Sequence, residues 1–443
     1  MTILAGFVSA CTPISQTTLS NTSQPANTAA PTETSTATLE PTSTITPFPT
    51  ATATPTLSPT PDYFAQANPL SEVEYVIPLT VRHTTKETAT FFFELQNPVE
   101  GIFVYRNMET QFQEEIPLSP EETRQMITIE GLTPGTKYEA QVLLGNAETG
   151  FRKPPYTGES WGAIQFRSLP DGWPIRVGVL GDASFGDDAT RTLVERMAAQ
   201  DLDFVIHTGD VVYETDPSDV FNTYLQKFYQ PFSPLLHQGP IYTVLGNHDY
   251  DASVRWEGAP FYDYAFPPFP DPTFSYPETR RSNQYYAIAV GDLQFILLDT
   301  HVFAGAEGRS DQDAWLEERL ADPRFRVSIP VFHASPFSSS VVHPDDGRPV
   351  RLSWNWRFEN ANVPLVLSGH FHHYERLISN GITYVVSGGG SSTLYALGEP
   401  LPVSQVYARK SHFVLLEFYA DHIDLYAISS SDEIIDQFYI VLK

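Results

Sequence analysis

Three histidines lie close together in the stretch Gly369-His370-Phe371-His372-His373-Tyr374-Glu375-Arg376. The stretch follows an apolar run, Val363 to Leu367, that is typical of a buried strand. Histidine is the commonest metal ligand among side chains, because its neutral imidazole keeps a lone pair near neutral pH. Two histidines that are two residues apart after a strand can face one point. The alternative is a polar surface loop, and the choice between the two depends on residues upstream.

Four predicted strands upstream also end in polar residues that can bind metals. Each strand is followed by its own motif. Gly181-Asp182 follows Ile175–Leu180, and Thr208-Gly209-Asp210-Val211-Val212-Tyr213 follows Phe204–Ile206. Gly246-Asn247-His248-Asp249 follows Ile241–Leu245, and His333 follows Val327–Phe332. Each signal is weak alone, because an Asp or Asn after a strand is more often a turn or capping residue. In open α/β sheets, however, ligands bind beyond the carboxyl ends of the strands. The five strands are therefore expected to bring Asp, Asp, Tyr, Asn and His side chains to one rim.

Helical patterns alternate with these strands, as in a sheet that is covered by helices. Asp188–Gln200 and Asp311–Leu320 have helical spacing, and a third helical segment is expected within Ser218–Gln238. A hinge-like break at Asp171-Gly172-Trp173-Pro174 precedes the first strand of this region. We therefore predict an α/β domain over residues 171–443.

Residues 70–170 show a different pattern, with short strands and no helical periodicity. The predicted strands are Glu74–Arg82, Thr88–Leu95, Gly101–Asn107, Gln125–Glu130, Lys137–Leu144 and Ala163–Ser168. Strands at this spacing indicate a β-sandwich. The segment Gly131-Leu132-Thr133-Pro134-Gly135-Thr136-Lys137-Tyr138-Glu139-Ala140 resembles a turn and strand of fibronectin type III domains. That resemblance implies that Tyr138 bonds back to the backbone, and that the domain is a spacer or a wall on the substrate side.

The N-terminal region resembles a secretion signal followed by a stalk. Residues 1–11 end in a short apolar run before Cys11, which resembles a bacterial lipoprotein signal whose cysteine becomes lipidated. Residues 12–62 are rich in Thr, Ser and Pro and contain no Gly, Lys or Arg, so they predict a disordered linker. No later stretch is long and apolar enough for a transmembrane helix. These features predict an extracytoplasmic cell-surface lipoprotein that contacts the membrane only through a lipid at Cys11.

The composition narrows the choice of partners. The 443 residues carry a formal net charge of −27, which disfavours nucleic acid and anionic membranes as partners. A single cysteine excludes a disulfide framework and a cysteine-based zinc site. An acidic protein that binds an anionic substrate needs a local positive centre, which metal ions supply. We expect a small-molecule substrate, and the sequence implies no partner protein.

The five motifs, in order across Arg176–Gly390, resemble the calcineurin-like metallophosphoesterases and, within them, the purple acid phosphatases. The resemblance implies an α-β-β-α sandwich that holds two metal ions. The implied ligands of the first ion are Asp182, Asp210, Tyr213 and His372. Asp210 would bridge to the second ion, which Asn247, His333 and His370 would complete. Two positions depart from the family pattern, because Ser184 stands where a glycine is usual and Ala334 where a second histidine is common.

The resemblance also implies a mechanism. Oxygen and nitrogen ligands suit Fe, Mn or Zn, and the purple branch implies Fe(III) beside a divalent ion of Fe, Zn or Mn. A metal-bound hydroxide would attack a phosphate ester, most simply a monoester as in acid phosphatases. His248 would act as an acid or phosphate-binding cation and His343 as a second phosphate contact. His373 is expected to be structural.

Other functions remain open at this stage. A phosphodiesterase or nucleotidase could use the same ions, and a surface-binding module could have kept the fold without the activity. The aromatic loop Glu257–Arg281 is expected to influence the choice of substrate.

Overall fold

The structure is a computed structural model of the chain. It describes residues 61–65, 68–185, 187–213, 218–250, 259–268, 274–275, 284–304 and 309–442. The predicted lipoprotein signal with Cys11 and residues 12–60 of the predicted linker lie outside these ranges, as does most of the loop Glu257–Arg281.

Two antiparallel sheets form the N-terminal domain. One contains β1 (Tyr75–Thr84), β2 (Ala89–Leu95) and β5 (Arg124–Ile129), and the other contains β4 (Gln113–Pro117), β3 (Gly101–Asn107), β6 (Lys137–Leu144) and β9 (Ile164–Arg167). A short hairpin follows β6 and consists of β7 (Pro155–Tyr156) and β8 (Glu159–Ser160). The ring of Phe91 contacts Phe103 at 4.7 Å and Phe166 at 5.1 Å between centroids, so the core joins both sheets. All six predicted strands form, and β4, β7 and β8 are additional strands.

Tyr138 makes the contact expected of it. Its hydroxyl accepts a hydrogen bond of 2.8 Å from the backbone N–H of Thr133. The domain's packing also begins before residue 70, because Tyr63 is buried against Val104 and Leu143. Two sheets closed by this tyrosine corner are compatible with a fibronectin type III-like domain, which remains a prediction.

Two larger sheets form the second region of the chain. The six-stranded sheet contains β12 (Ile241–Thr243), β11 (Phe204–His207), β10 (Ile175–Leu180), β21 (His412–Phe418), β22 (His422–Ser429) and β23 (Ile434–Val441). The eight-stranded sheet contains β13 (Phe274–Ser275), β14 (Tyr286–Val290), β15 (Leu293–Leu298), β16 (Val327–Ala334), β17 (Leu365–Gly369), β19 (Ile382–Ser387), β18 (Tyr374–Ser379) and β20 (Ser404–Ala408). Buried apolar side chains of both sheets share one core, in which Phe204 contacts Phe295 at 5.4 Å.

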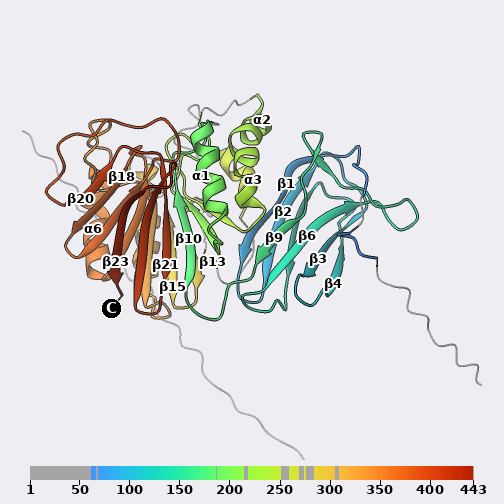
Figure 1. Cartoon of the computed structure of the whole chain (residues 1–443). Coiled ribbons are helices and arrows are strands. Elements are labelled where there is room, and N and C mark those ends of the chain that lie inside the picture. The colour runs from blue at the N-terminus through green and yellow to red at the C-terminus, as the bar shows by residue number, and fades with distance from the viewer. Residues whose placement is uncertain are drawn as a thin grey trace, which may run out of the picture. The chain divides into compact units, whose positions relative to one another are not determined.

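Helices cover the outer faces of this pair of sheets (Figure 1). α1 (Asp188–Ala198), α2 (Val220–Tyr224), a π-helical turn (Leu225–Tyr229) and α3 (Gln230–Leu236) accompany the six-stranded sheet. α5 (Arg309–Leu320) and α6 (Arg348–Asn360) pack on the eight-stranded sheet, next to the 3-10 turn Thr300–Ala304. A short helix, α4 (Pro260–Ala265), precedes β13. The layers are helix, sheet, sheet and helix, as predicted, although α6 was not expected from the sequence.

The direction of the central strands determines where their loops meet. β10, β11 and β12 are parallel to one another, as are β15, β16 and β17. Parallel strands present their carboxyl ends at the same edge. The predicted ligands therefore lie in the loops after β10, β11, β12 and β17 and at the carboxyl end of β16. None of the helices in the described ranges is long and apolar enough to span a membrane.

The N-terminal domain packs against the helical layer through Trp161 and His237. The rings of the two residues contact each other edge to face at 4.5 Å, and the N–H of Gln165 donates to the His237 carbonyl at 2.7 Å. The Nε2 atom of His237 is buried without a hydrogen-bond partner among the described residues. Burial of the ring lowers the pKa of His237 to about 4, so the folded protein holds this histidine neutral.

Acid should therefore weaken this contact. The unfolded chain binds a proton at His237 near its ordinary pKa of 6.5, whereas the folded chain does so only near pH 4. Stability is thus present above pH 6.5 and falls as the pH drops toward 4. Between pH 7 and pH 5 the wild type should lose up to about 2 kcal/mol more than His237→Phe in denaturant unfolding. Any metal release at low pH affects both proteins, and equal losses would contradict the assignment.

Candidate metal centre

Seven predicted side chains converge where the five loops meet, and they form two groups. The first group contains Asp182, Tyr213 and His372. The Tyr213 hydroxyl lies 3.1 Å from both Asp182 Oδ1 and His372 Nε2, and those two atoms are 3.3 Å apart. Ligand atoms of Asp182, Asp210 and His372 all lie within 4.8 Å of one another, which is close enough for one ion.

The second group surrounds His333. Its Nε2 atom lies 3.2 Å from Asn247 Oδ1, 3.2 Å from His370 Nδ1 and 3.4 Å from Asp210 Oδ2. Asp210 therefore reaches both groups, which is the position that the resemblance implies for a bridging carboxylate. Asp210 contacts the two sets of ligands from a single loop, the one after β11.

The backbone at these strand ends is unusual. Asp182, Asp210 and His370 have φ values of 56°, 52° and 69°, in the left-handed region that residues with a Cβ rarely adopt. Such strain is tolerated where the surrounding structure holds it, and it often marks a functional site. Gly209 and Gly246 permit the close approach of the loops, because a Cβ at Gly209 would lie 2.5 Å from His333 Nδ1 and one at Gly246 would overlap the Asp210 carboxylate.

Asp249 joins two of these loops. Its carboxylate accepts hydrogen bonds from the backbone N–H groups of Gly246 at 2.8 Å and of Val211 and Val212 at 3.1 Å. The loop after β11, which carries Asp210, is thereby fastened to the loop after β12, which carries Asn247. Asp249 therefore supports the positions of both loops.

The three histidines of the two groups are oriented by acceptors on their outer nitrogens. His333 Nδ1 lies 2.8 Å from the Thr208 carbonyl, and His372 Nδ1 lies 2.7 Å from the Thr393 carbonyl. A carbonyl only accepts, so each Nδ1 donates to its carbonyl, and Nε2 is the ring nitrogen that faces the site. His370 is turned the other way, because its Nε2 lies 3.0 Å from Asp346 Oδ2. Its Nδ1 therefore faces the second group.

The buried carboxylates give the site a negative charge that a cation would balance. Asp182 and Asp210 are 0% and 1% exposed, and neither forms an ion pair with Lys or Arg within the described ranges. Burial lowers the pKa of His333, but Asp210 and Asp182 outweigh it and raise that pKa to about 10. A proton on His333 thus partly balances the two carboxylates. Because buried charges need a partner, this set of oxygen and nitrogen donors fits metal ions well.

Aromatic rings shield the first group. Phe185 stacks on Tyr213 at 3.9 Å, and Tyr395 stacks on His372 at 4.0 Å. Burial raises the pKa of Tyr213 well above its usual value, and Asp182 and Asp210 raise it further. Tyr213 is therefore a phenol in the absence of a cation, and a strongly charged ion would be needed to make it a phenolate ligand.

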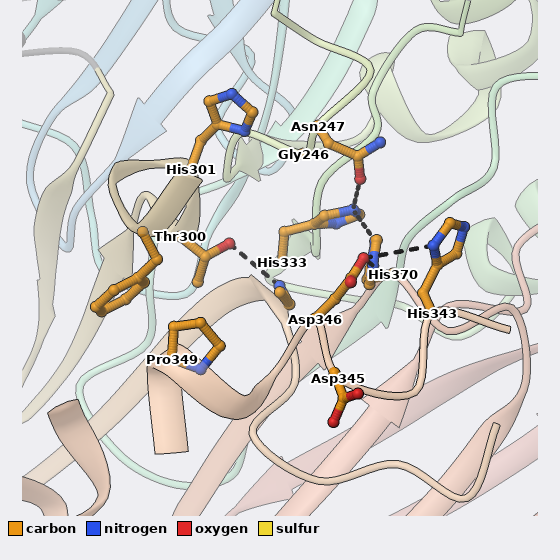
Figure 2. Close-up of a pocket in the computed structure, with 12 residues that line it drawn as sticks. Gly246, Asn247, Thr300, His301, His333, His343, Asp345, Asp346, Pro349 and His370 are labelled. Carbon is orange, nitrogen blue, oxygen red and sulfur yellow. Dashed lines mark hydrogen bonds and ion pairs between the residues drawn. The ribbon is translucent and has the colours of Figure 1, made fainter. Parts of the chain in front are cut away.

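A cavity of about 450 Å³ opens beside the second group (Figure 2). Asn247, His333 and His370 line it, together with His343, the predicted phosphate contact. His343 is exposed and stands 5.5 Å from the His370 ring. The other predicted catalytic residue, His248, is also exposed, and its ring lies 4.5 Å from Tyr213. The two histidines thus lie beside different groups.

Asp346 was missed by the sequence reasoning. Its Oδ2 atom lies 3.0 Å from His370 Nε2 and 3.5 Å from His343 Nδ1, so one carboxylate contacts both histidines. The spacing of three residues between His343 and Asp346 was the only available signal, and such spacing is common in turns. His301 also lines the cavity and stacks on Tyr250 at 4.1 Å. His373, by contrast, is buried and bonds to Glu375 at 3.1 Å.

The comparisons with known proteins agree with this geometry. Residues 175–374 match the model of the calcineurin-like phosphoesterase family. Purple acid phosphatase 22 of Arabidopsis thaliana is 26% identical over 219 residues, which are 48% of each chain. Probable purple acid phosphatase 20 of the same plant is 28% identical over 221 residues, which are 48% of this chain and 49% of the relative. The chain thus spans about half the length of these relatives.

Two solved structures share the fold. The purple acid phosphatase PPD1 from yellow lupin (Lupinus luteus) seeds superposes with a TM-score of 0.64 at 17% identity, covering 82% of this chain and 74% of the other. PhoD superposes with a TM-score of 0.60 at 12% identity, covering 83% of this chain and 88% of the other. Residues 175–374 thus form a calcineurin-like phosphoesterase domain, and purple acid phosphatases are among the relatives of this chain.

The contact between Asp346 and His370 leads to a test of the second group. Removing the carboxylate that orients a metal-binding histidine typically weakens metal affinity about 10- to 100-fold. Asp346→Asn should therefore weaken the binding of one of two ions by about that factor, in titrations of metal-free protein with Zn²⁺ or Mn²⁺. Asp345→Asn, which removes the neighbouring carboxylate, is the control and should bind both ions as the wild type does. Unchanged affinity in Asp346→Asn would refute the role.

Proposed function

We propose that this protein is a dinuclear-metal phosphoesterase that hydrolyses small phosphate monoesters, as acid phosphatases do. The observation that carries the proposal is the convergence of seven predicted ligands from five loops into two groups that share Asp210. A family model that matches residues 175–374 supports the same conclusion. Seven such donors would rarely occur together by chance in the order of the family motifs.

The residues divide into two proposed sets of ligands. Asp182, Asp210, Tyr213 and His372 would hold the first ion, and Asp210, Asn247, His333 and His370 the second. Two bound ions would supply positive charge opposite the phosphoryl oxygens and acidify a water molecule that serves as the nucleophile. The protein's own contribution is to hold these donors in place. Asp249 fastens the loops of Asp210 and Asn247 to each other, and the three outer-nitrogen contacts orient the histidines.

His248 and His343 would handle the substrate. Both side chains are exposed beside the buried donors, so each can reach a bound phosphate ester from solvent. His343 Nδ1 lies 3.5 Å from Asp346 Oδ2, and this contact holds the ring beside the cavity. We assign His343 to binding a phosphoryl oxygen, or to protonating the departing alcohol, on the side of the cavity. His248 would bind phosphate from the side of Tyr213.

Two other functions remain candidates. A phosphodiesterase or nucleotidase would use the same two groups of donors, and the cavity of about 450 Å³ is large enough for a larger alcohol. A surface-binding module without activity is disfavoured, because none of the seven donors is missing. For the whole protein we propose a location outside the cytoplasm on a lipid anchor at Cys11, with a small-molecule substrate and no nucleic acid.

Metal dependence tests the proposed activity. Purified protein should contain two ions per chain and should hydrolyse phenyl phosphate faster than diphenyl phosphate. A chelator should abolish turnover until metal is restored. Asp210→Asn should lower kcat/KM at least about a hundredfold, because it removes the shared donor of both groups. Glu121→Gln, on the N-terminal domain, is a matched loss of one charge and should behave as wild type. A chain that holds less than one ion and hydrolyses neither ester would disprove the proposal.

Tyr213 offers a test of the metal's identity. We propose Fe(III) in the first group, because a phenolate is a hard anionic ligand that suits a trivalent ion. The protein should then be coloured by phenolate-to-iron charge transfer, and Tyr213→Phe should bleach it while iron stays bound. The visible spectrum and the iron content are measured on the same sample. Full activity in a colourless protein that contains only Zn or Mn would exclude this assignment.

A further inference from the structure

Two carboxylates line the cavity beside the second group, and one of them, Asp345, has no part in the mechanism above. Twelve residues line the cavity, and Asp345 and Asp346 are the only carboxylates among them. No Lys or Arg belongs to this lining. The remaining walls come from histidines and from small or apolar side chains, among them Phe303, Ala334 and Pro349. Figure 2 shows the two carboxylates on the same loop, below His370 and His343.

The two carboxylates differ in what they contact. Asp346 is engaged by His370 at 3.0 Å and by His343 at 3.5 Å. Asp345 is exposed and makes no ion pair or side-chain hydrogen bond with the residues that the structure describes. Arg309 lies 4.7 Å from the Phe303 ring but is outside the lining, and it binds Ser353 and Asp313. The cavity therefore retains the negative charge of Asp345.

The position of the cavity indicates which part of a substrate would occupy it. If the phosphoryl group binds at the two groups of donors, as in the proposed function, its ester oxygen can face His343, which lines the cavity. The alcohol that this oxygen carries would then extend into the cavity that Asp345 and Phe303 line. An alcohol with a further negative charge would be repelled, and one with a positive charge would be attracted.

We propose that this cavity is the leaving-group site and that it selects phosphate monoesters whose alcohol carries a quaternary or protonated amine, with Asp345 as the residue that determines the preference. The proposal rests on the proposed function, and it adds a class of substrate to it. The apolar walls suit the carbon atoms of such an alcohol, and the exposed carboxylate suits its charge. No contact of Asp345 with the metal donors is needed.

A pair of esters that differ only in charge tests this preference. Phosphocholine carries a quaternary nitrogen, and dimethylbutyl phosphate is its isostere with carbon in that place. An exposed charge contributes modestly, so kcat/KM should favour phosphocholine about two- to fivefold at low salt. The ratio should approach one as salt is added, because screening acts within about 10 Å at 0.1 M ionic strength. Equal kcat/KM for the two esters at low salt would overturn the proposal.

The variants separate this site from a general effect of net charge. Asp345→Asn should bring the ratio of the two kcat/KM values close to one, whereas Glu121→Gln, an equal change in net charge on the N-terminal domain, should keep the wild-type ratio. A preference that survives in Asp345→Asn would overturn the role of Asp345. Phenyl phosphate separates the two proposals: turnover of phenyl phosphate without a cation preference refutes only the leaving-group site, and no turnover of any ester by metal-loaded protein refutes the proposed function itself.

Discussion

The burial of two carboxylates at one point is the constraint on which the rest of this domain depends. Asp182 and Asp210 are almost completely shielded from water, and the only ion-pair partners that they have in the described ranges are His372 and His333. Placing charge in such surroundings is unfavourable unless a cation or a hydrogen-bond network compensates it. The glycines before the ligands, the left-handed turns and the oriented histidines can all be understood as the means of holding those carboxylates where ions would balance them. Metal binding and the stability of this rim should thus be coupled.

Much of this arrangement could be predicted from the sequence, because the signals are local. Glycine followed by Asp, Asn or His at the end of an apolar run is visible in the chain, and parallel strands bring such ends together. The strands of the N-terminal domain could also be predicted, because short strand-like runs follow one another there without helical periodicity. Residues that act through another side chain could not be predicted in this way. Asp346 became apparent only when its distance to His370 was known.

Other elements escaped prediction for physical reasons. β4 consists of Gln113–Pro117, in which only Ile116 is a large apolar residue, so its sequence does not look like a strand. α6 contains exposed Leu352 and Trp356 as well as buried Trp354 and Phe358, so its apolar residues do not mark one face. In both cases neighbouring elements, rather than local pattern, decide the structure. The missed helix follows directly on the loop that carries His343 and Asp346.

The N-terminal domain is connected by direct contacts to the elements that carry the candidate ligands. Arg124 donates to the Tyr264 carbonyl at 2.7 Å, which ties the domain to α4. Within α4, Tyr262 is buried and donates to the Thr243 carbonyl of β12 at 3.0 Å. β12 leads directly into the loop of Asn247. A continuous set of contacts therefore connects the N-terminal domain to the strand that carries one of the candidate ligands.

The left-handed turns at Asp182, Asp210 and His370 have a practical consequence for protein engineering. Asparagine adopts this backbone conformation more readily than alanine, because its short polar side chain bonds locally. Replacing either aspartate by asparagine removes the charge and keeps the local chain geometry, whereas alanine alters both. Asparagine variants are therefore the better choice for trapping an uncleaved ligand in a crystal. Alanine variants would confound the loss of a ligand with a rearranged loop.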